Sequence, residues 1–191
     1  MKVKKIIVLV IVALGFWHVS ASAYMLSKAW LSQYLISQSW QQTLDDKQNH
    51  KPWSWADTYP IATINFPRIK QSSVVLEGSS GRNLAFSVTH LSASGMPDEN
   101  KTMILSGHRD SHFAYLHDVQ KGDKIIVQTT QGKFSYQVTE LRVVDSTKEQ
   151  LSITNKQELI LSTCYPFDAL MAGGSLRYVV KAEKFENKTV S

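Results

Sequence analysis

One uninterrupted apolar run dominates the N-terminal part of the chain. Residues 6–26 carry no formal charge and are mostly apolar, and a lysine-rich start, residues 2–5, precedes them. About 20 such residues can cross a bilayer as a helix, and basic residues favour the cytoplasmic side. We therefore predict a transmembrane signal-anchor over residues 1–26, passing once through the cytoplasmic (inner) membrane, with the rest of the chain outside the cytoplasm. The alternative is a cleaved signal peptide, because Ala21-Ser22-Ala23 is typical of a cleavage site.

The pattern then changes to a helical period, followed by a polar stretch. Residues 45–57 are polar, contain a proline and show no clear period, which is typical of a linker. We therefore predict an amphipathic helix and linker over residues 27–57, with Trp53 and Trp55 packed against the folded domain. Trp30, Tyr34 and Trp40 would lie at the membrane interface or against the domain. The helical period rests on Leu26, Trp30, Leu31, Tyr34, Leu35, Gln38 and Leu44, which lie near i, i+4, i+8 spacing.

Short β-type runs separated by turn residues fill the rest of the chain up to residue 185. Residues 124–130 and 133–139 form the clearest hairpin, joined by Gln131-Gly132, and residues 113–119 fit one or two helical turns. Many short strands with few helices indicate a mainly β fold, a closed or nearly closed barrel, over residues 58–185. Residues 186–191 would form a tail. The predicted strands are 61–64, 73–76, 102–106, 124–129, 133–144, 158–162 and 176–182.

Composition narrows the function classes. The chain has 43% hydrophobic and 19% charged residues, so it is neither disordered nor wholly embedded in a membrane. Its net charge is +5, but the lysines are scattered apart from those at the N-terminus, so we expect no nucleic-acid partner. The chain has one cysteine, Cys164, which excludes an intrachain disulfide.

Candidate chemistry lies at the ends of two apolar runs. Cys164 ends one run, and His108 follows the other at a similar position. A thiol and an imidazole are the two parts that a cysteine nucleophile needs, and Arg177 is a candidate donor to an oxyanion. Taken singly, each has a simpler interpretation: a buried apolar cysteine, a histidine bonded to the backbone, a surface arginine. His108, His112 and His117 are too irregularly spaced for a metal site, so we expect no metal.

These residues also carry a family resemblance. Gly107-His108-Arg109-Asp110, the run Leu161-x-Thr163-Cys164-Tyr165-Pro166-Phe167 and the later Arg177 resemble the His, Cys and Arg motifs of sortases. The resemblance covers residues 59–184. Sortases are membrane-anchored cysteine transpeptidases with an eight-stranded β-barrel, and the Thr-Cys-Tyr-Pro-Phe run looks most like class D or E and their proteobacterial relatives.

The resemblance implies a role for each of these residues. Cys164 would be the nucleophile, His108 the general acid and base, and Arg177 the group that stabilises the substrate carbonyl or oxyanion. Thr163 would shape the substrate-binding site, and His90 resembles a second histidine that is often present near it. Arg109 and Asp110 would form an ion pair that orients the loop around His108.

The resemblance also implies partners. Cys164 would cleave a Leu-Pro-x-Thr-Gly-like sorting signal at the C-terminus of a secreted or surface protein, form a thioester and pass the protein to an amine nucleophile, without a cofactor. A purely hydrolytic cysteine protease is a close variant. A non-catalytic, membrane-tethered β-domain that binds a surface protein is the alternative from another class.

Overall fold

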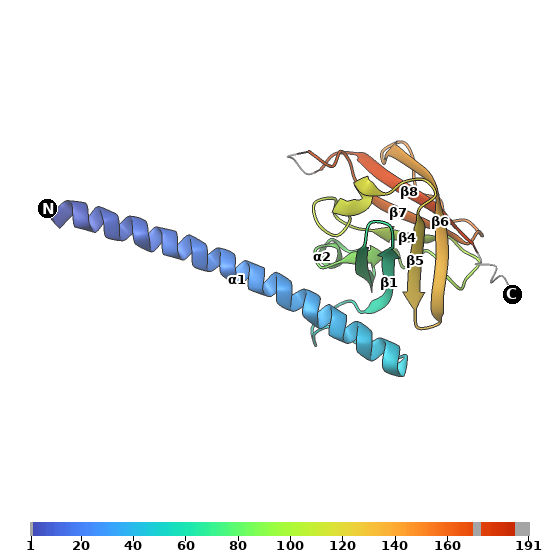
Figure 1. Ribbon diagram of the computed structural model, residues 1–191, viewed down its shortest axis with the longest axis horizontal. Coiled ribbons are helices and arrows are strands. Elements are labelled where there is room, and N and C mark those ends of the chain that lie inside the picture. The colour runs from blue at the N-terminus through green and yellow to red at the C-terminus, as the bar shows by residue number, and fades with distance from the viewer. Residues whose placement is uncertain (1, 170–172, 186–191) are drawn as a thin grey trace.

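A single helix, α1, forms the N-terminal quarter of the molecule, from Lys2 to Asp46 (Figure 1). This computed structural model describes residues 2–169 and 173–185, so the predicted tail, residues 186–191, lies outside the described residues. α1 has 45 residues, and it is long and apolar enough to cross a membrane. At a rise of about 1.5 Å per residue it extends roughly 67 Å, about twice the hydrocarbon thickness of a bilayer. The predicted anchor and amphipathic helix are therefore one continuous helix.

The C-terminal half of α1 packs on the outside of the barrel. Ile36, Ser39, Trp40 and Thr43 are buried and recur every three or four residues, which places them on one face of the helix. Trp40 packs against the domain, which is one of the two predicted placements, whereas Trp30 and Tyr34 are exposed and their place at the membrane interface stays a prediction. Small hydroxyl side chains allow a close approach of helix and barrel, and a pattern of large apolar residues does not reveal them.

The end of α1 is tied to the segment that follows it. The chain leaves the helix at Lys47, which has a positive φ of 60° and donates its N–H to the Thr43 carbonyl at 3.0 Å. Ser39 Oγ donates to the His50 carbonyl, and Thr43 Oγ1 accepts the His50 N–H at 3.3 Å. The linker is therefore held against the helix over its first residues.

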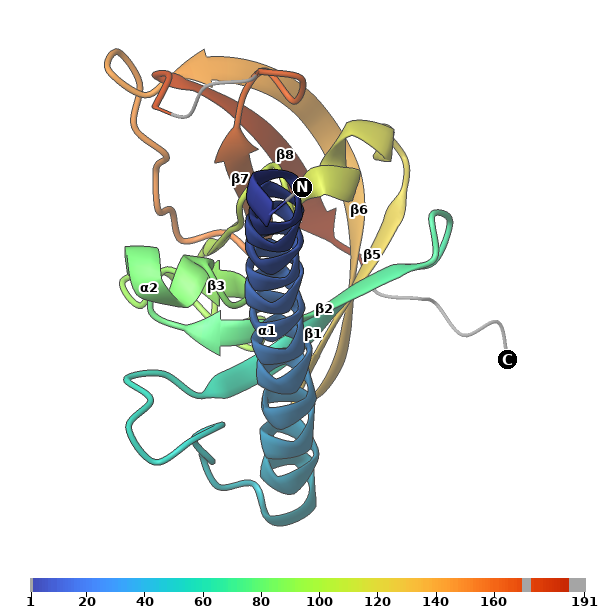
Figure 2. The same ribbon diagram turned by 90° about the vertical axis from the view of Figure 1, so that its left-hand side faces the viewer.

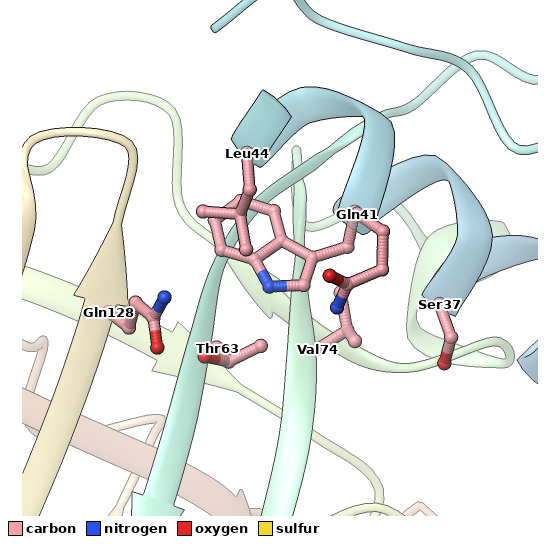
Figure 3. A pocket seen from close by; sticks show the side chains of 7 residues that line it. Ser37, Gln41, Leu44, Thr63, Val74 and Gln128 are labelled. Atoms are coloured by element: carbon pink, nitrogen blue, oxygen red, sulfur yellow. The ribbon is translucent and has the colours of Figure 1, made fainter. Parts of the chain in front are cut away.

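A cavity of about 430 Å³ lies between α1 and the barrel. Figure 3 shows Gln41 and Leu44 of α1 over Thr63, Val74 and Gln128, which come from three strands. The interface between α1 and the barrel is therefore only partly filled at this position.

Eight strands in the described part of the chain close into a barrel, which confirms the predicted mainly β, eight-stranded fold. Their order around the barrel is β1-β2-β3-β4-β7-β8-β6-β5. Closure leaves no unpaired strand edge. The strands are β1 (Pro60–Phe66), β2 (Gln71–Glu77), β3 (Val88–His90), β4 (Met103–Ser106), β5 (Lys124–Thr129), β6 (Gly132–Asp145), β7 (Glu158–Cys164) and β8 (Leu176–Lys184), and the short helices are α2 (Gly81–Leu84) and the 3₁₀ helix η1 (Ala114–Asp118).

β3 is the strand that the sequence pattern did not reveal. It has three residues, all buried, so it shows no alternation of apolar and polar positions. It pairs in parallel with β2 and antiparallel with β4. The predicted hairpin is present as β5 and β6, and the predicted helical turns are η1.

β7 is buried on both faces. Leu159 and Leu161 point into the barrel interior, whereas Ile160 joins Ile104 and Val179 in a second apolar cluster on the outer face. Burial on both faces explains why this strand is a continuous apolar run rather than an alternating one. The alternation of side chains along β7 also shows which face Cys164 occupies. Cys164 lies four residues after Ile160 and therefore shares the outer face with it.

His90 forms a buried polar contact beside the β2–β3 pair. Its Nδ1 lies 2.8 Å from Glu77 Oε2, and its Nε2 lies 3.0 Å from Ser94 Oγ and 3.2 Å from the Gly95 carbonyl. Burial opposes the ionisation of Glu77, but hydrogen bonds with His90 and Ser92 outweigh it and lower the pKa of this carboxyl below its ordinary value of 4.5. The Glu77 carboxylate is thus more stable in the folded chain than in the unfolded one.

The lowered pKa of Glu77 gives a pH-dependent prediction. A carboxyl whose pKa falls on folding stabilises the fold above its unfolded pKa, and this contribution is lost as the pH falls through the folded pKa. We expect Glu77→Gln to lower the melting temperature at neutral pH, with a deficit that shrinks once the pH is below 4.5. Thermal unfolding as a function of pH measures this. Glu183→Gln, at an exposed position of β8, is the matched control, and a Glu77→Gln deficit independent of pH contradicts the assignment.

Candidate active site

Strand register brings the three predicted catalytic residues to one end of the barrel. Cys164 is paired with Arg177 across the antiparallel strands β7 and β8. β4 runs parallel to β7 with Ser106 opposite Ser162, so His108 and Cys164 each lie two residues beyond a matched pair. Because both parallel strands reach the same end, the loop that carries His108 begins beside Cys164.

The side chains of Cys164 and Arg177 share the outer face of the barrel. Val179, two residues after Arg177, belongs to the outer apolar cluster together with Ile160 of β7. Alternation along each strand therefore places Arg177 and Cys164 on that face as well. Cys164 is partly buried and His108 is exposed. A half-buried thiol on a strand position paired with an arginine, with an exposed histidine in the loop that begins beside it, can be reached from solvent and suits a cysteine nucleophile.

Two backbone carbonyls orient the Arg177 side chain. Its Nη1 donates to the Gly174 carbonyl at 2.6 Å and to the Leu176 carbonyl at 2.8 Å. These bonds hold the plane of the guanidinium, which has further N–H groups on Nε and Nη2. One of the two glycines in the preceding loop, Gly174, therefore supplies a carbonyl that positions the arginine.

Thr163 acts from inside the fold. Its side chain is 3% exposed, and its Oγ1 donates to the Gly107 carbonyl at 2.8 Å. The Gly107 N–H in turn donates to the Ser162 carbonyl at 3.3 Å. Gly107 is therefore fastened to β7 on both sides, directly before His108. His90 is also 3% exposed, and its ring is bonded to Glu77 and Ser94. In this structure the side chains of Thr163 and His90 thus both contact protein groups, and their substrate-binding roles stay predictions.

Gly107 is required by a close contact. A Cβ atom at this position would lie 2.8 Å from Cγ of the buried Phe113 ring. Phe113 also donates its N–H to the His108 carbonyl at 2.9 Å, which closes the loop on itself. The loop from Gly107 to Phe113 is thus anchored in the barrel core at one end and on β7 at the other.

Arg109 connects the histidine loop to the segment after Cys164. Its side chain is 7% exposed, with Nη1 donating to the Pro166 carbonyl at 2.9 Å and Nη2 to the Ala169 carbonyl at 3.0 Å. The predicted ion pair with Asp110 is present at 3.1 Å. The ion pair could be predicted from the sequence. The two carbonyl contacts could not, because a backbone acceptor in a distant segment is not visible in the pattern of side chains.

An aromatic cluster flanks this end of the barrel. The rings of Tyr165 and Tyr178 are stacked at 6.3 Å, and Phe167 contacts both at 6.2 and 5.2 Å. Burial, and then the charge of Tyr165, raise the pKa of Tyr178, so its phenol is neutral at physiological pH. Tyr165 and Phe167 stand in the motif around Cys164, whereas no signal in the sequence singles out Tyr178.

His112 carries the loop toward α1. It lines a cavity of about 300 Å³ together with Gln33 and Ser37 of the helix. Burial chiefly lowers the pKa of His112, a hydrogen bond to the Ala85 backbone opposes this, and the nearby charge of His108 lowers it further. The ring of His117 instead contacts Phe167 at 5.6 Å. The loop that presents His108 therefore extends from the barrel to a cavity that it shares with α1.

Comparison with known proteins places this geometry in a family. The model of the sortase domain matches residues 64–185. Sortase D of Bacillus subtilis (strain 168) is 34% identical over 125 residues, which are 63% of this chain and 62% of that protein. The chain thus spans less than two thirds of that relative's length.

Solved structures of sortases are also similar to this chain. A Clostridium perfringens sortase D5 transpeptidase has a TM-score of 0.59 and 26% identity, over 78% of this chain and 89% of that one. Streptococcus agalactiae sortase C1 in complex with MTSET has a TM-score of 0.57 and 27% identity, over 66% and 69% of the two chains.

The bond from Thr163 to Gly107 predicts a coupled loss of stability and activity. Thr163→Val keeps the shape but removes the donor, and an unsatisfied buried carbonyl costs about 1–3 kcal/mol. We expect a lower free energy of unfolding in denaturant titration and a lower kcat, because the loop before His108 loses its tie to β7. Thr139→Val, whose hydroxyl bond to the Lys181 carbonyl is longer at 3.4 Å, is the control. A Thr163→Val variant that matches wild type in both measurements contradicts the assignment.

The two carbonyl contacts of Arg109 predict that charge alone is insufficient at this position. Lysine retains the charge but lacks the planar fork that reaches two carbonyls at once. We expect Arg109→Lys to reduce kcat/KM about tenfold, the effect of roughly 1.4 kcal/mol at the transition state. Arg142→Lys, on β6 in surface ion pairs with Glu140 and Glu149, should leave kcat/KM unchanged. Equal rates for the two variants would show that Arg109 does not position the site.

Proposed function

Because this chain belongs to the sortase family, we propose that it is a cysteine transpeptidase that cleaves a C-terminal Leu-Pro-x-Thr-Gly-like sorting signal. The observation that carries the proposal is the pairing of Cys164 with Arg177 on the outer face of β7 and β8, beside the loop of His108. The comparisons give no support to a non-catalytic, membrane-tethered binding domain. The relative named sortase D agrees with a class D-like enzyme.

The first half of the reaction forms a thioester. The Cys164 thiolate attacks the threonine carbonyl of the sorting signal, and the resulting oxyanion accepts hydrogen bonds from the guanidinium of Arg177. When the tetrahedral intermediate collapses, the Thr–Gly bond breaks and His108 gives a proton to the departing amine. The products are an acyl-enzyme on Cys164 and a free peptide that begins with glycine.

The second half transfers the protein. An amine attacks the thioester carbonyl, His108 removes its proton, and the Cys164 sulfur leaves as the thiolate. Water in place of the amine would give hydrolysis instead. The fixed position of Arg177, held by the Gly174 and Leu176 carbonyls, supports its role in both steps, because the same oxyanion forms twice.

α1 supports a membrane location for the enzyme. We place α1 across the cytoplasmic membrane as a single-pass anchor, with the barrel outside the cytoplasm. The substrate is then a secreted or surface protein with a C-terminal sorting signal, and the acceptor is an amine on the same side of the membrane.

Product analysis with a sorting-signal peptide tests the proposal. We expect the full-length protein in detergent to cleave between threonine and glycine and, when an amine is added, to convert the hydrolysed product into the amide. Cys164→Ala should remove both products, and His108→Ala and Arg177→Ala should reduce both severely. Amide formation in the Cys164→Ala variant would contradict the nucleophile. Cleavage that an added amine never diverts would assign the protein to the hydrolytic variant.

A further inference from the structure

The linker after α1 runs back along the helix toward its apolar N-terminal half. His50 contacts Ser39 and Thr43 near the end of α1. Three residues later the Trp53 ring meets Phe86 edge to face at 5.0 Å, and Phe86 accepts a 2.6 Å hydrogen bond from Gln33 Nε2. Along α1 the contacts thus move from residue 43 back to residue 33, and the linker turn after Trp53 lies near the level of Gln33.

Three exposed aromatic side chains lie at this level. Trp55, in the linker turn, is 82% exposed, which contradicts the prediction that it packs against the domain; Trp53 does pack. On α1, Trp30 and Tyr34 are 71% and 49% exposed and stack on each other at 5.8 Å. At 100° per residue they lie about 120–180° around the helix from Ile36 and Thr43, so they do not share the buried face of α1. Large exposed aromatic residues of this kind indicate a contact with something outside the molecule.

The position of these residues along α1 identifies what they contact. The apolar run ends at residue 26, so the Cα atoms of Trp30 and Tyr34 lie about 6 and 12 Å beyond it along the helix axis. Side chains on a helix point back toward its N-terminus, which brings both rings closer to the membrane than their Cα atoms. The headgroup layer beyond the hydrocarbon core is about 5–8 Å thick on each side of a bilayer, and tryptophan and tyrosine concentrate there. Since α1 continues without a break from the apolar run, Trp30 and Tyr34 follow directly on the membrane-spanning part.

We propose that Trp30, Tyr34 and Trp55 form a membrane-docking edge that seats the barrel on the headgroup layer of the bilayer that α1 crosses. The inference rests on the proposed role of α1 as an anchor. It extends that role, because a single span would leave the domain free to tilt, whereas a second contact through Trp55 defines its orientation.

That orientation bears on the active site. The barrel end at which β7 finishes and β8 begins lies on the side toward the N-terminal end of α1 (Figure 1), and Figure 2 is viewed from this side. Cys164 and Arg177 are at that end. With the docking edge in the headgroup layer, the site faces the membrane surface, where a peptide that precedes a membrane-spanning segment would be held. The edge therefore favours substrates that are still attached to the membrane.

Cys164 makes the docking edge directly testable, because it is the chain's only cysteine. In the Cys164→Ala background, Trp55→Cys and Gln131→Cys each provide one site for a fluorescent label, and Gln131 is exposed in the β5–β6 turn. The full-length variants are placed in phosphatidylcholine–phosphatidylglycerol vesicles with and without a headgroup-level quencher lipid. We expect quenching at position 55 and none at position 131.

Three results would overturn the docking edge: no quenching at position 55, equal quenching at both positions, or quenching at position 55 that is lost as the protein-to-lipid ratio rises, which would assign the edge to a second copy of the chain. None of these depends on catalysis, so the outcome is independent of the proposed function. A second measurement uses the active enzyme. Trp55→Ala should lower the rate on a vesicle-anchored sorting-signal peptide several-fold and leave the rate on a soluble peptide unchanged, whereas Gln131→Ala should change neither; equal rates on both substrates contradict the proposal.

Discussion

The site depends on one constraint, the parallel pairing of β4 with β7. This pairing places Ser106 opposite Ser162, and two hydrogen bonds then fasten Gly107 between the Ser162 carbonyl and the Thr163 hydroxyl. Only glycine fits at position 107, because a Cβ atom there would collide with the Phe113 ring. Cys164 and His108 are neighbours for that reason alone, although 56 positions separate Thr163 from Gly107 along the chain.

Further contacts hold the loop of His108 on its other sides. Arg109 links it to the carbonyls of Pro166 and Ala169, so the segments that follow the histidine and the cysteine move together. His112 extends the loop to the cavity beneath α1. The His108 side chain is exposed, but the backbone of its loop is fixed to the core, to the cysteine segment and to the helix side of the barrel. Such support keeps a reacting group in place without burying it.

Much of this arrangement could be predicted from the sequence. The strands with clear alternation, the β5–β6 hairpin and the apolar run that ends at Cys164 each follow from local patterns, and Cys164, His108 and Arg177 follow from motif resemblance. β3 escaped because three buried residues have no period. The partners of Arg109 and Thr163 escaped because they are backbone carbonyls from distant segments. The face of α1 that packs on the barrel escaped in part because Ser39 and Thr43 bury hydroxyls that a hydrophobic pattern counts as exposed.

The central claim is that Cys164 forms a thioester with the threonine of a sorting signal, and intact-mass spectrometry tests it most directly. Protein mixed with a sorting-signal peptide and quenched in acid should gain the mass of the peptide up to threonine. Peptide mapping should place that mass on the segment containing Cys164, and neutral hydroxylamine should release it. An unmodified mass during active turnover, or an adduct on another residue that hydroxylamine does not release, would contradict the account.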